Sequence, residues 1–556
     1  MANNNSVSTA QNQACLTPQQ CTTDFSSQLS TSTVTNDNWT SMFPITSERL
    51  RHFFHLPQPL LLLNAQYWHA AKEITEACND QKRPFVALQN FDQETLFGRV
   101  NLSNGEQVSA QLGAISKFKD GIVVLHISSL LVSPNLWFLL KSFLLNHRIP
   151  SQGPVNSDKL RGEVTTDNNQ SLNTKIILVA NRYQLDELTQ IDPDFSQINT
   201  LFAEISGDIK RSDKNIQHLH RYCQSIIAHK SLSPLSKGAF NTLFKYLSHL
   251  CDHQNKLLFS PKLIESTLLY AQLLKTENSP LDDCIDEIHI KKSLDIQDKA
   301  QSNAQDFSDQ ALLEKQLKIQ LHGEMIGQIN GLSVVELMGY PTEFGEIFRI
   351  SASDMVGDGE IIDIERKVEL AGNVHAKSTL IVQGYLNHFF THIANFPLSC
   401  NVVFEQSYQE SDGDSASLAI LLAVTSCYSQ KAISQNLFVT GALDQHGNVL
   451  AIGGINQKIE SITRLFTLGL LSDSVSVIIP KANQINLMLS DETLALIKDG
   501  KINIYAIQHC LEAFPIAMSQ SFETVFEMIN KRILFLHKED DDEPLSFVTK
   551  CLNLLR

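Results

Sequence analysis

Short apolar runs rich in β-branched residues alternate with amphipathic segments along much of this 556-residue chain. Residues 121–127 (GIVVLHI) and 175–181 (KIILVAN) are two such runs, and both suit strands that are buried on both faces. Residues 135–145, between them, carry apolar side chains at helical spacing. Strands interleaved with helices favour an α/β fold with parallel pairing. Because the chain is longer than one core usually supports, we expect several domains.

The character of the sequence changes several times, and these changes predict the domain boundaries. The first residues are rich in Asn, Gln, Ser and Thr, which cannot bury enough apolar surface to offset their conformational entropy. Beyond the first α/β region the pattern is mainly helical, then acidic and rich in Gln and Ser, and then α/β again. The predicted parts are a disordered segment (1–42), an α/β domain (43–201), a helical domain (202–275), a linker (276–321), a second α/β domain (322–517) and a C-terminal tail (518–556).

Charge and cysteine spacing exclude several classes of function. Acidic residues outnumber basic ones 60 to 44, and the net charge of −16 argues against binding to nucleic acid or anionic membranes. No two of the ten cysteines lie three positions apart, so no CxxC pattern indicates a metal site. The most apolar stretch is interrupted by polar residues and predicts no membrane span. The N-terminal residues lack the pattern of a secretory signal, so we expect a cytoplasmic protein with reduced, buried thiols.

Ser415 stands between a polar turn, residues 411–414 (SDGD), and the apolar run of residues 416–424. The run predicts a buried helix with Ser415 at or just inside its N-terminus, where backbone N–H groups are unpaired. Serine in this place has two interpretations. It can be a simple N-cap, or a nucleophile whose oxyanion is stabilised by the nearby amides.

Lys458 follows two glycines, in the segment 453–458 (GGINQK), and falls in the first turns of a predicted helix. A helix N-terminus is an unfavourable place for a cation because the helix dipole repels it. Lys458 is therefore either an exposed lysine or a buried amine kept neutral. Lowering its pKa from about 10.4 to about 7–8 would disfavour the charged form by roughly 3–4 kcal/mol, which burial can supply. A neutral amine can accept the proton of a serine hydroxyl.

Six short motifs resemble segments of the proteolytic domain of the Lon proteases and occur along the chain in the order found there. The serine motif is closer to the B-type branch. The resemblance covers about residues 323–517 and implies a Ser–Lys dyad, in which Ser415 is the nucleophile and Lys458 the general base. It also implies that Thr440 orients the lysine; without it, Thr440 is typical of an ordinary β-branched strand residue. The motifs are 372–377 (GNVHAK), 404–408 (FEQSY), 412–417 (DGDSAS), 439–443 (VTGAL), 453–458 (GGINQK) and 477–483 (VIIPKAN).

Lon proteases couple this domain to an ATPase, but the sequence lacks the nucleotide-binding motifs. The phosphate-binding pattern GxxxxGK[ST] is absent, and the run 121–127 continues without the acidic residues that manage Mg²⁺. Residues 121–145 and 175–181 are nevertheless similar to the Walker B and sensor strands of the B-type ATPase, with Asn181 at the strand end. The resemblance therefore implies a degenerate AAA+-like α/β domain with a helical lid, followed by a Lon-type α/β proteolytic domain. ATP is implied by the family but not supported by these motifs.

These observations predict a serine endopeptidase that cleaves unfolded or flexible proteins. The resemblance also implies a homo-oligomeric ring, a hexamer. Two alternatives stay open. One is a catalytically weak Lon-like assembly or binding protein. The other is an ATP-dependent protease that relies on an unrecognised site or on a partner ATPase.

Overall fold

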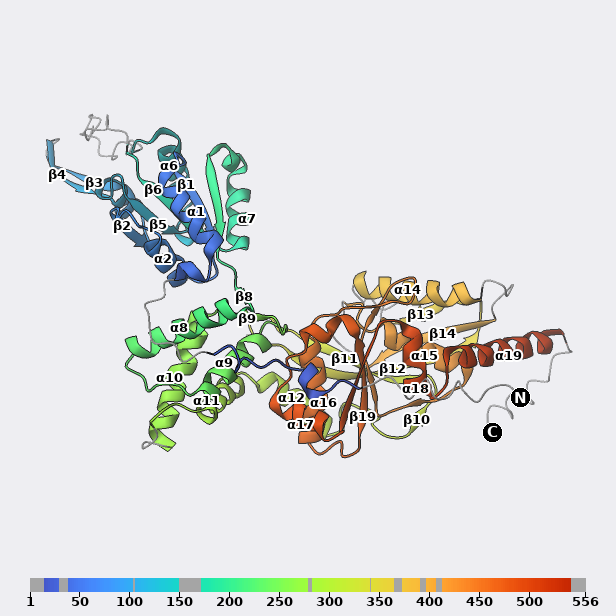
Figure 1. The fold of residues 1–556 in the computed structure, drawn as a ribbon. Helices are drawn as coiled ribbons and strands as arrows, with labels where there is room; N and C mark the ends of the chain where they lie inside the picture. Colours follow the sequence, from blue (N-terminus) through green and yellow to red (C-terminus); the bar gives the residue numbers. More distant parts are fainter. Residues whose placement is uncertain are drawn as a thin grey trace. The chain divides into compact units, whose positions relative to one another are not determined.

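The computed structural model describes residues 15–29, 39–103, 106–149, 172–278, 283–340, 342–364, 373–390, 397–406 and 413–541. The chain divides into two compact units and passes between them several times. One unit consists of Met1–Asp24, Ser248–Asn255 and Leu294–Arg556, and the other of Phe25–Leu247 and Lys256–Ser293. We call the first the C-terminal unit and the second the N-terminal unit (Figure 1).

A five-stranded parallel sheet with the strand order β2-β5-β6-β1-β7 forms the centre of the N-terminal unit. The apolar runs predicted as buried strands form β5 and β6; four of the five residues of β5 and all six residues of β6 are buried. The α/β class and the parallel pairing are therefore confirmed. The strands are β1 (Leu60–Asn64), β2 (Phe85–Leu88), β5 (Ile122–His126), β6 (Lys175–Ala180) and β7 (Thr200–Glu204).

Helices and two short antiparallel pairs, β3 with β4 and β8 with β9, complete the N-terminal unit. The helices that accompany the sheet are α1 (Pro44–His55), α2 (Trp68–Ala77), α3 (Gln93–Phe97), α4 (Ala114–Lys117), α5 (Ser128–Val132), α6 (Pro134–Asn146) and α7 (Arg182–Ile191), with the 3-10 turns η3 (Trp39–Ser41) and η4 (Pro193–Gln197). The helical part contains α8 (Asp213–His229), α9 (Lys237–His249), α10 (Pro261–Asn278) and the start of α11 (Glu287–Lys299). The short pairs are β3 (Gly98–Ser103), β4 (Glu106–Leu112), β8 (Asp208–Lys210) and β9 (Lys256–Leu258).

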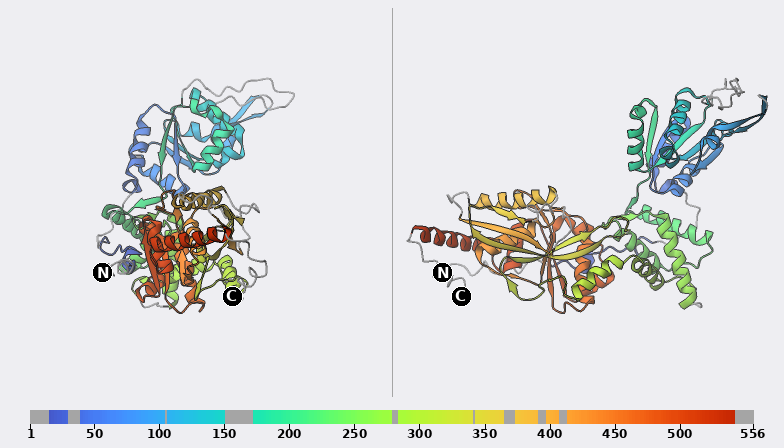
Figure 2. Two further views of the ribbon diagram at one scale, coloured as in Figure 1. Left: turned by 90° about the vertical axis from the view of Figure 1, so that its right-hand side faces the viewer. Right: turned by 180° about the vertical axis from the view of Figure 1, so that it is seen from behind.

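A seven-stranded mixed sheet with the order β13-β14-β12-β11-β16-β19-β20 forms the centre of the C-terminal unit (Figure 2). Its long strands β11, β12 and β14 are antiparallel, whereas β16, β19 and β20 are parallel. The strands are β11 (Gln328–Val335), β12 (Phe344–Val356), β13 (Ile361–Asp363), β14 (Leu398–Glu405), β16 (Leu437–Val439), β19 (Val475–Pro480) and β20 (Ile502–Ile507).

Alternating side chains of the mixed sheet enter two different apolar cores, one on each face. Ile478 packs into the core that contains α15, while its neighbours Val477 and Ile479 pack into the core that contains α16. Every residue of α15 (Ser417–Ser429) is buried, as the apolar run predicted. The remaining elements are η2 (Pro18–Gln20), α12 (Asn303–Leu313), β10 (Glu324–Met325), α14 (Asn373–Phe389), β15 (Ile433–Ser434), β17 (Ala442–Leu443), β18 (Val449–Leu450), α16 (Ile455–Thr467), η5 (Lys481–Asn486), α17 (Asp491–Lys498), η6 (Cys510–Glu512), α18 (Ala513–Met518) and α19 (Phe522–Asp541).

Two segments that the sequence left outside the folded domains pack into cores. Residues 15–29, expected to belong to a disordered segment that ends at residue 42, are ordered: Leu16 N donates to Ile504 O, and Cys21 is fully buried. The expectation was wrong because Leu16 and Cys21 pack into the apolar core that contains α16, and composition alone does not reveal this contact. At the other end, α19 buries Val525 and Ile529 within the expected tail. The other predicted domain boundaries stay predictions.

The described residues also bear on membrane insertion and on the burial of the cysteines. Among the helices in the described ranges, none combines the length and apolar character that crossing a bilayer requires. Six of the nine cysteines in those ranges are buried.

Candidate active site

Ser415 lies in the turn that leads into α15, two residues before its first helical residue. The turn is fastened to the chain just after β16, because Ser415 O accepts a hydrogen bond from Gly441 N at 2.7 Å and Gly441 O accepts one from Leu418 N at 3.1 Å. The N-cap position of α15 is occupied by Ala416, and no side chain caps the helix. The simple N-cap interpretation of Ser415 is therefore wrong.

Lys458 lies in the first turn of α16 and extends toward Ser415 from the opposite face of the mixed sheet. Its Nζ is 3.0 Å from Ser415 Oγ and 3.3 Å from Thr440 Oγ1. Thr440 directly follows β16 and is fully buried, and Lys458 is only 3% exposed. The interpretation of Lys458 as an exposed lysine is thus excluded. The end of β16 is the point where the three side chains predicted from the sequence converge.

Burial controls the charge of the Lys458 amine. Desolvation lowers its pKa from 10.5 to about 8, and the carboxylate of Asp414 acts in the opposite direction by favouring the protonated form. With a pKa near 8, roughly one amine in ten is neutral at pH 7 and most are neutral at pH 9. A neutral amine within hydrogen-bonding distance of a hydroxyl can accept its proton, which is the chemistry of an activated nucleophile.

Two glycines shape the approach of α16 to the site. Gly454 has a φ of 61°, in the left-handed region, and a Cβ there would lie 2.4 Å from Val334 Cγ2, so the tight passage predicted from the paired glycines is confirmed. Gly345, in β12, was not singled out by the sequence. A Cβ on Gly345 would lie 2.0 Å from Gln457 O and 3.0 Å from Lys458 N. A lone glycine inside a strand was the available signal, since it often marks a close backbone approach.

Some motif residues fall outside the described residues. These are Asp412, the end of the 404–408 motif and Gly372. Within the described ranges, no group of three or more His, Cys, Asp or Glu side chains is arranged to hold a metal ion.

In an open parallel sheet a nucleotide binds outside the carboxyl ends of the strands, and the candidate position in this sheet is the turn that follows its first strand, β1. That turn, residues 65–67 between β1 and α2, contains no glycine, so it lacks the backbone freedom that a phosphate-cradling loop requires. Asn64, at the end of β1, donates to Glu204 Oε1 at 2.7 Å. A carboxylate at this edge would repel phosphate groups. The residues of this turn do not fit ATP.

Two further polar residues at this edge serve the fold. His126, at the end of β5 where the family has an acid, packs edge-on against the Trp68 ring at 5.6 Å, and burial lowers its pKa. Asn181 Oδ1 accepts from Gln184 N at 2.9 Å, and Gln184 Oε1 accepts from Asn181 N at 3.0 Å. This reciprocal pair caps α7 and accounts for Asn181 as a structural residue.

The mixed α/β unit places a buried lysine beside a serine, and comparison with known proteins identifies the class of this domain. The family model described as "Lon protease (S16) C-terminal proteolytic domain" matches residues 309–519, and the model described as "LonB-like, AAA domain" matches residues 81–206. A Lon protease homolog of Escherichia coli (strain K12) is 30% identical over 474 residues, which cover 84% of this chain and 79% of that protein. This chain belongs to the Lon protease family.

Other relatives support the same assignment. A Lon protease homolog of Haemophilus influenzae is 31% identical over 451 residues, covering 80% of this chain and 73% of the relative. The archaeal Lon protease of Archaeoglobus fulgidus is 24% identical over 473 residues, covering 82% and 72%. The resemblance inferred from the motifs is confirmed, and it extends across both the AAA-like and the proteolytic regions.

Proposed function

We propose that this chain is a serine endopeptidase that uses a Ser415–Lys458 dyad. The observation that carries the proposal is a buried amine whose pKa lies near 8 and whose nitrogen is 3.0 Å from a serine hydroxyl. Burial makes the neutral amine accessible near physiological pH, and the short distance lets it act directly on the hydroxyl.

In the proposed reaction, Ser415 Oγ attacks the carbonyl carbon of a peptide bond while Lys458 Nζ takes the hydroxyl proton. Backbone amides near Ser415 stabilise the oxyanion of the tetrahedral intermediate. The protonated lysine then gives its proton to the leaving amine, and an acyl-enzyme forms on Ser415. A water molecule then attacks the acyl-enzyme in the same way: Lys458 Nζ takes a proton from the water and returns it to Ser415 Oγ as the carboxylic acid is released. Thr440 Oγ1, 3.3 Å from Lys458 Nζ, holds the amine in line with the hydroxyl.

The proposed substrates are unfolded or flexible proteins, and the proposed assembly is a homo-hexameric ring that excludes folded chains. Membership of the Lon family supports both. We also propose that cleavage does not depend on ATP bound by this chain, because the turn after β1 is not suited to phosphate. Dependence on a partner ATPase is the competing proposal.

The decisive experiment compares wild type with Ser415→Ala on a fluorescein-labelled, unfolded casein. Loss of a nucleophile that acts together with its base lowers kcat by roughly 10³-fold or more in serine peptidases. Ser472→Ala, which changes an exposed serine of the same unit, is the matched control and should keep full activity. Equal hydrolysis by wild type and Ser415→Ala would reject the peptidase proposal in favour of a non-catalytic assembly protein.

A further inference from the structure

The first turn of α16 contains a second buried polar side chain, Asn456, two residues before Lys458. Asn456 is fully buried, and each end of its amide is engaged. Its Oδ1 accepts from Met488 N at 2.8 Å, and its Nδ2 donates to Asn486 O at 3.0 Å and to Asp252 Oδ1 at 2.7 Å. An amide with this many short bonds fixes the backbone that carries it.

Asp252 comes from a part of the chain that is 204 positions away from Asn456. It belongs to residues 248–255, a loop segment of the C-terminal unit that runs from the end of α9 to β9. Two hydrogen bonds fix the backbone of this loop: Asn486 Nδ2 donates to Asp252 O at 2.8 Å, and Gln254 N donates to Ile485 O at 2.9 Å. Asp252 has a φ of 45°, so its carboxylate is presented from a left-handed turn.

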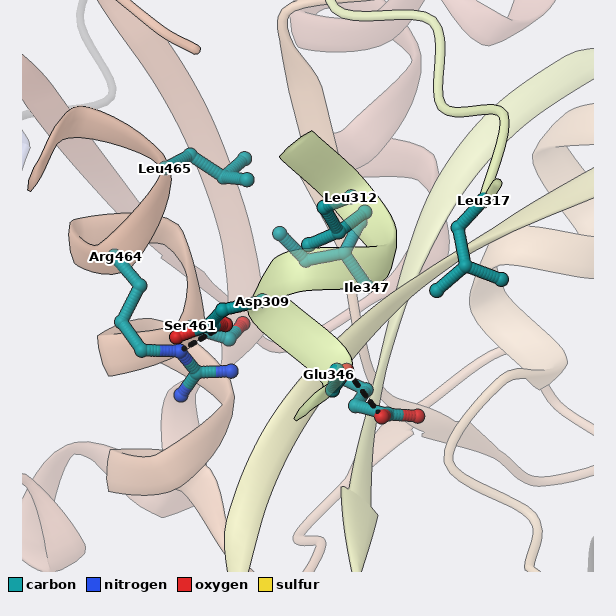
Figure 3. Close-up of a pocket in the computed structure, with 9 residues that line it drawn as sticks. Asp309, Leu312, Leu317, Glu346, Ile347, Ser461, Arg464 and Leu465 are labelled. Atoms are coloured by element: carbon teal, nitrogen blue, oxygen red, sulfur yellow. Dashed lines mark hydrogen bonds and ion pairs between the residues drawn. The ribbon is translucent and has the colours of Figure 1, made fainter. Parts of the chain in front are cut away.

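Another set of contacts holds α16 further along. Arg464 of α16 donates to Asp309 Oδ1 of α12 at 3.1 Å (Figure 3). Arg464 also donates to Gly345 O of β12. These contacts fix the helix beyond its first turn. At the first turn itself, Asp252 is the only charged side chain that the described residues bond to Asn456, and a carboxylate acceptor makes the stronger kind of hydrogen bond.

We propose that Asp252 is a positioning residue for the Lys458 amine, an inference that rests on the proposed dyad. Through Asn456 it holds the first turn of α16, and so it holds Lys458 Nζ at 3.0 Å from Ser415 Oγ. Misplacement of a catalytic group by about 1 Å can cost on the order of 10²-fold in rate. The side chain of Asp252 contacts Asn456 directly, whereas its backbone is linked to Asn456 through Asn486.

The test compares Asp252→Gly with Asp252→Asn. Glycine accepts the left-handed backbone and removes the carboxylate, whereas asparagine tolerates the same backbone and keeps an Oδ1 acceptor. We expect kcat to fall roughly tenfold in Asp252→Gly with KM unchanged, and to stay within about twofold of wild type in Asp252→Asn. The matched control is Asp120→Gly, which alters an exposed aspartate with a similar φ of 59° and should leave kcat unchanged.

Two readouts separate positioning from general loosening. The pH profile of kcat/KM should keep its midpoint near 8 in Asp252→Gly, because burial of the amine is intact, while its plateau falls. A midpoint that moves toward 10.5 would mean that water has entered the site and would overturn the inference. In a double-mutant cycle, Asp252→Gly combined with Asn456→Ala should lose no more kcat than Asn456→Ala alone, and additive losses would also overturn it.

The experiment stays decisive in each circumstance. If Asp252→Gly does not fold, Asn456→Ala removes the same hydrogen bond from its other partner and leaves the left-handed residue unchanged, and wild-type kcat in that variant would overturn the inference. Wild-type kcat in Asp252→Gly, or an equal loss in Asp252→Asn, rejects the role of Asp252 while leaving the peptidase proposal intact. Equal hydrolysis by wild type and Ser415→Ala in the same assay rejects the peptidase proposal itself.

Discussion

The turn before α16 and the turn before α2 both lead from a strand region into a helix, but they contain different residues and polar partners. The first has two glycines, one of them left-handed, and it brings a buried lysine to 3.0 Å from a serine. The second has no glycine, and the polar residues around it pair with one another, as Asn64 does with Glu204. Polar groups that converge on a shared point can do chemistry, whereas groups that satisfy each other only stabilise the fold. The four predictions below test this difference.

The largest effect is expected from Lys458→Met, which keeps the length of the side chain and removes the amine. Activity on unfolded casein should fall roughly 10³-fold, because the hydroxyl of Ser415 loses its base. The same change should raise the free energy of unfolding at pH 7, since a lysine whose pKa is lowered from 10.5 to about 8 destabilises the fold. By linkage that penalty is about 3 kcal/mol below pH 8 and disappears as the pH rises toward 10.5.

Urea unfolding at pH 7 and pH 10 measures this difference in stability. Lys481→Met, an exposed lysine in η5, is the matched control and should change neither activity nor the pH dependence of stability. A Lys458→Met variant that is less stable than wild type at pH 7 would contradict the buried-amine interpretation.

A smaller loss of activity is expected from Gly345→Ala. The added Cβ would lie 2.0 Å from Gln457 O, so the first turn of α16 must move and carry Lys458 away from Ser415. We expect kcat to fall on the order of 10²-fold. Gly384→Ala, where no atom lies within 4 Å of the added Cβ, is the control and should retain wild-type kcat. Full activity in Gly345→Ala would mean that the approach of β12 to α16 does not matter for the reaction.

The charge of Asp414 should tune the lysine. In wild type, kcat/KM should rise with pH and reach half its maximum near pH 8, because the neutral amine is the active form. Asp414→Asn removes the carboxylate that favours the protonated form, so this midpoint should move to lower pH. Asp499→Asn removes the same charge from an exposed position at the end of α17 and should leave the midpoint in place. An upward shift in Asp414→Asn would contradict the electrostatic argument.

The smallest effect concerns the other turn. Adding Mg·ATP should change neither the rate of casein cleavage nor the thermal midpoint, because the turn after β1 has no groups suited to phosphate. A ligand present at 100 times its Kd would add about 2.7 kcal/mol of stability, which thermal unfolding detects readily. A clear upward shift with Mg·ATP, absent with Mg²⁺ alone, would show that this region binds nucleotide and that the contrast between the two turns is wrong.

Local patterns in the sequence were sufficient to predict much of the fold, and the resemblance of short motifs to the Lon family was needed to predict the Ser415–Lys458 pair. Strands β5 and β6 and the buried helix α15 can be recognised from the apolar content of a few consecutive residues. Ser415, Thr440 and Lys458 were identified because short motifs carry them in a characteristic order. The predicted disorder of residues 15–29 was wrong, because the surface that orders them is formed by residues hundreds of positions away.

By itself, then, the sequence determined the α/β class and the order of the elements, since these depend on neighbours along the chain. The dyad of Ser415 and Lys458 is a prediction that the sequence offers through its resemblance to the Lon family. Tertiary structure alone decided that the Lys458 amine is buried and that its pKa falls to about 8, because desolvation depends on everything packed around it. It also decided that β1 lies between β6 and β7 in its sheet and that Asp252 meets Asn456. Strand order and contacts across 204 positions have no local signature, because they arise only when separate segments pack together.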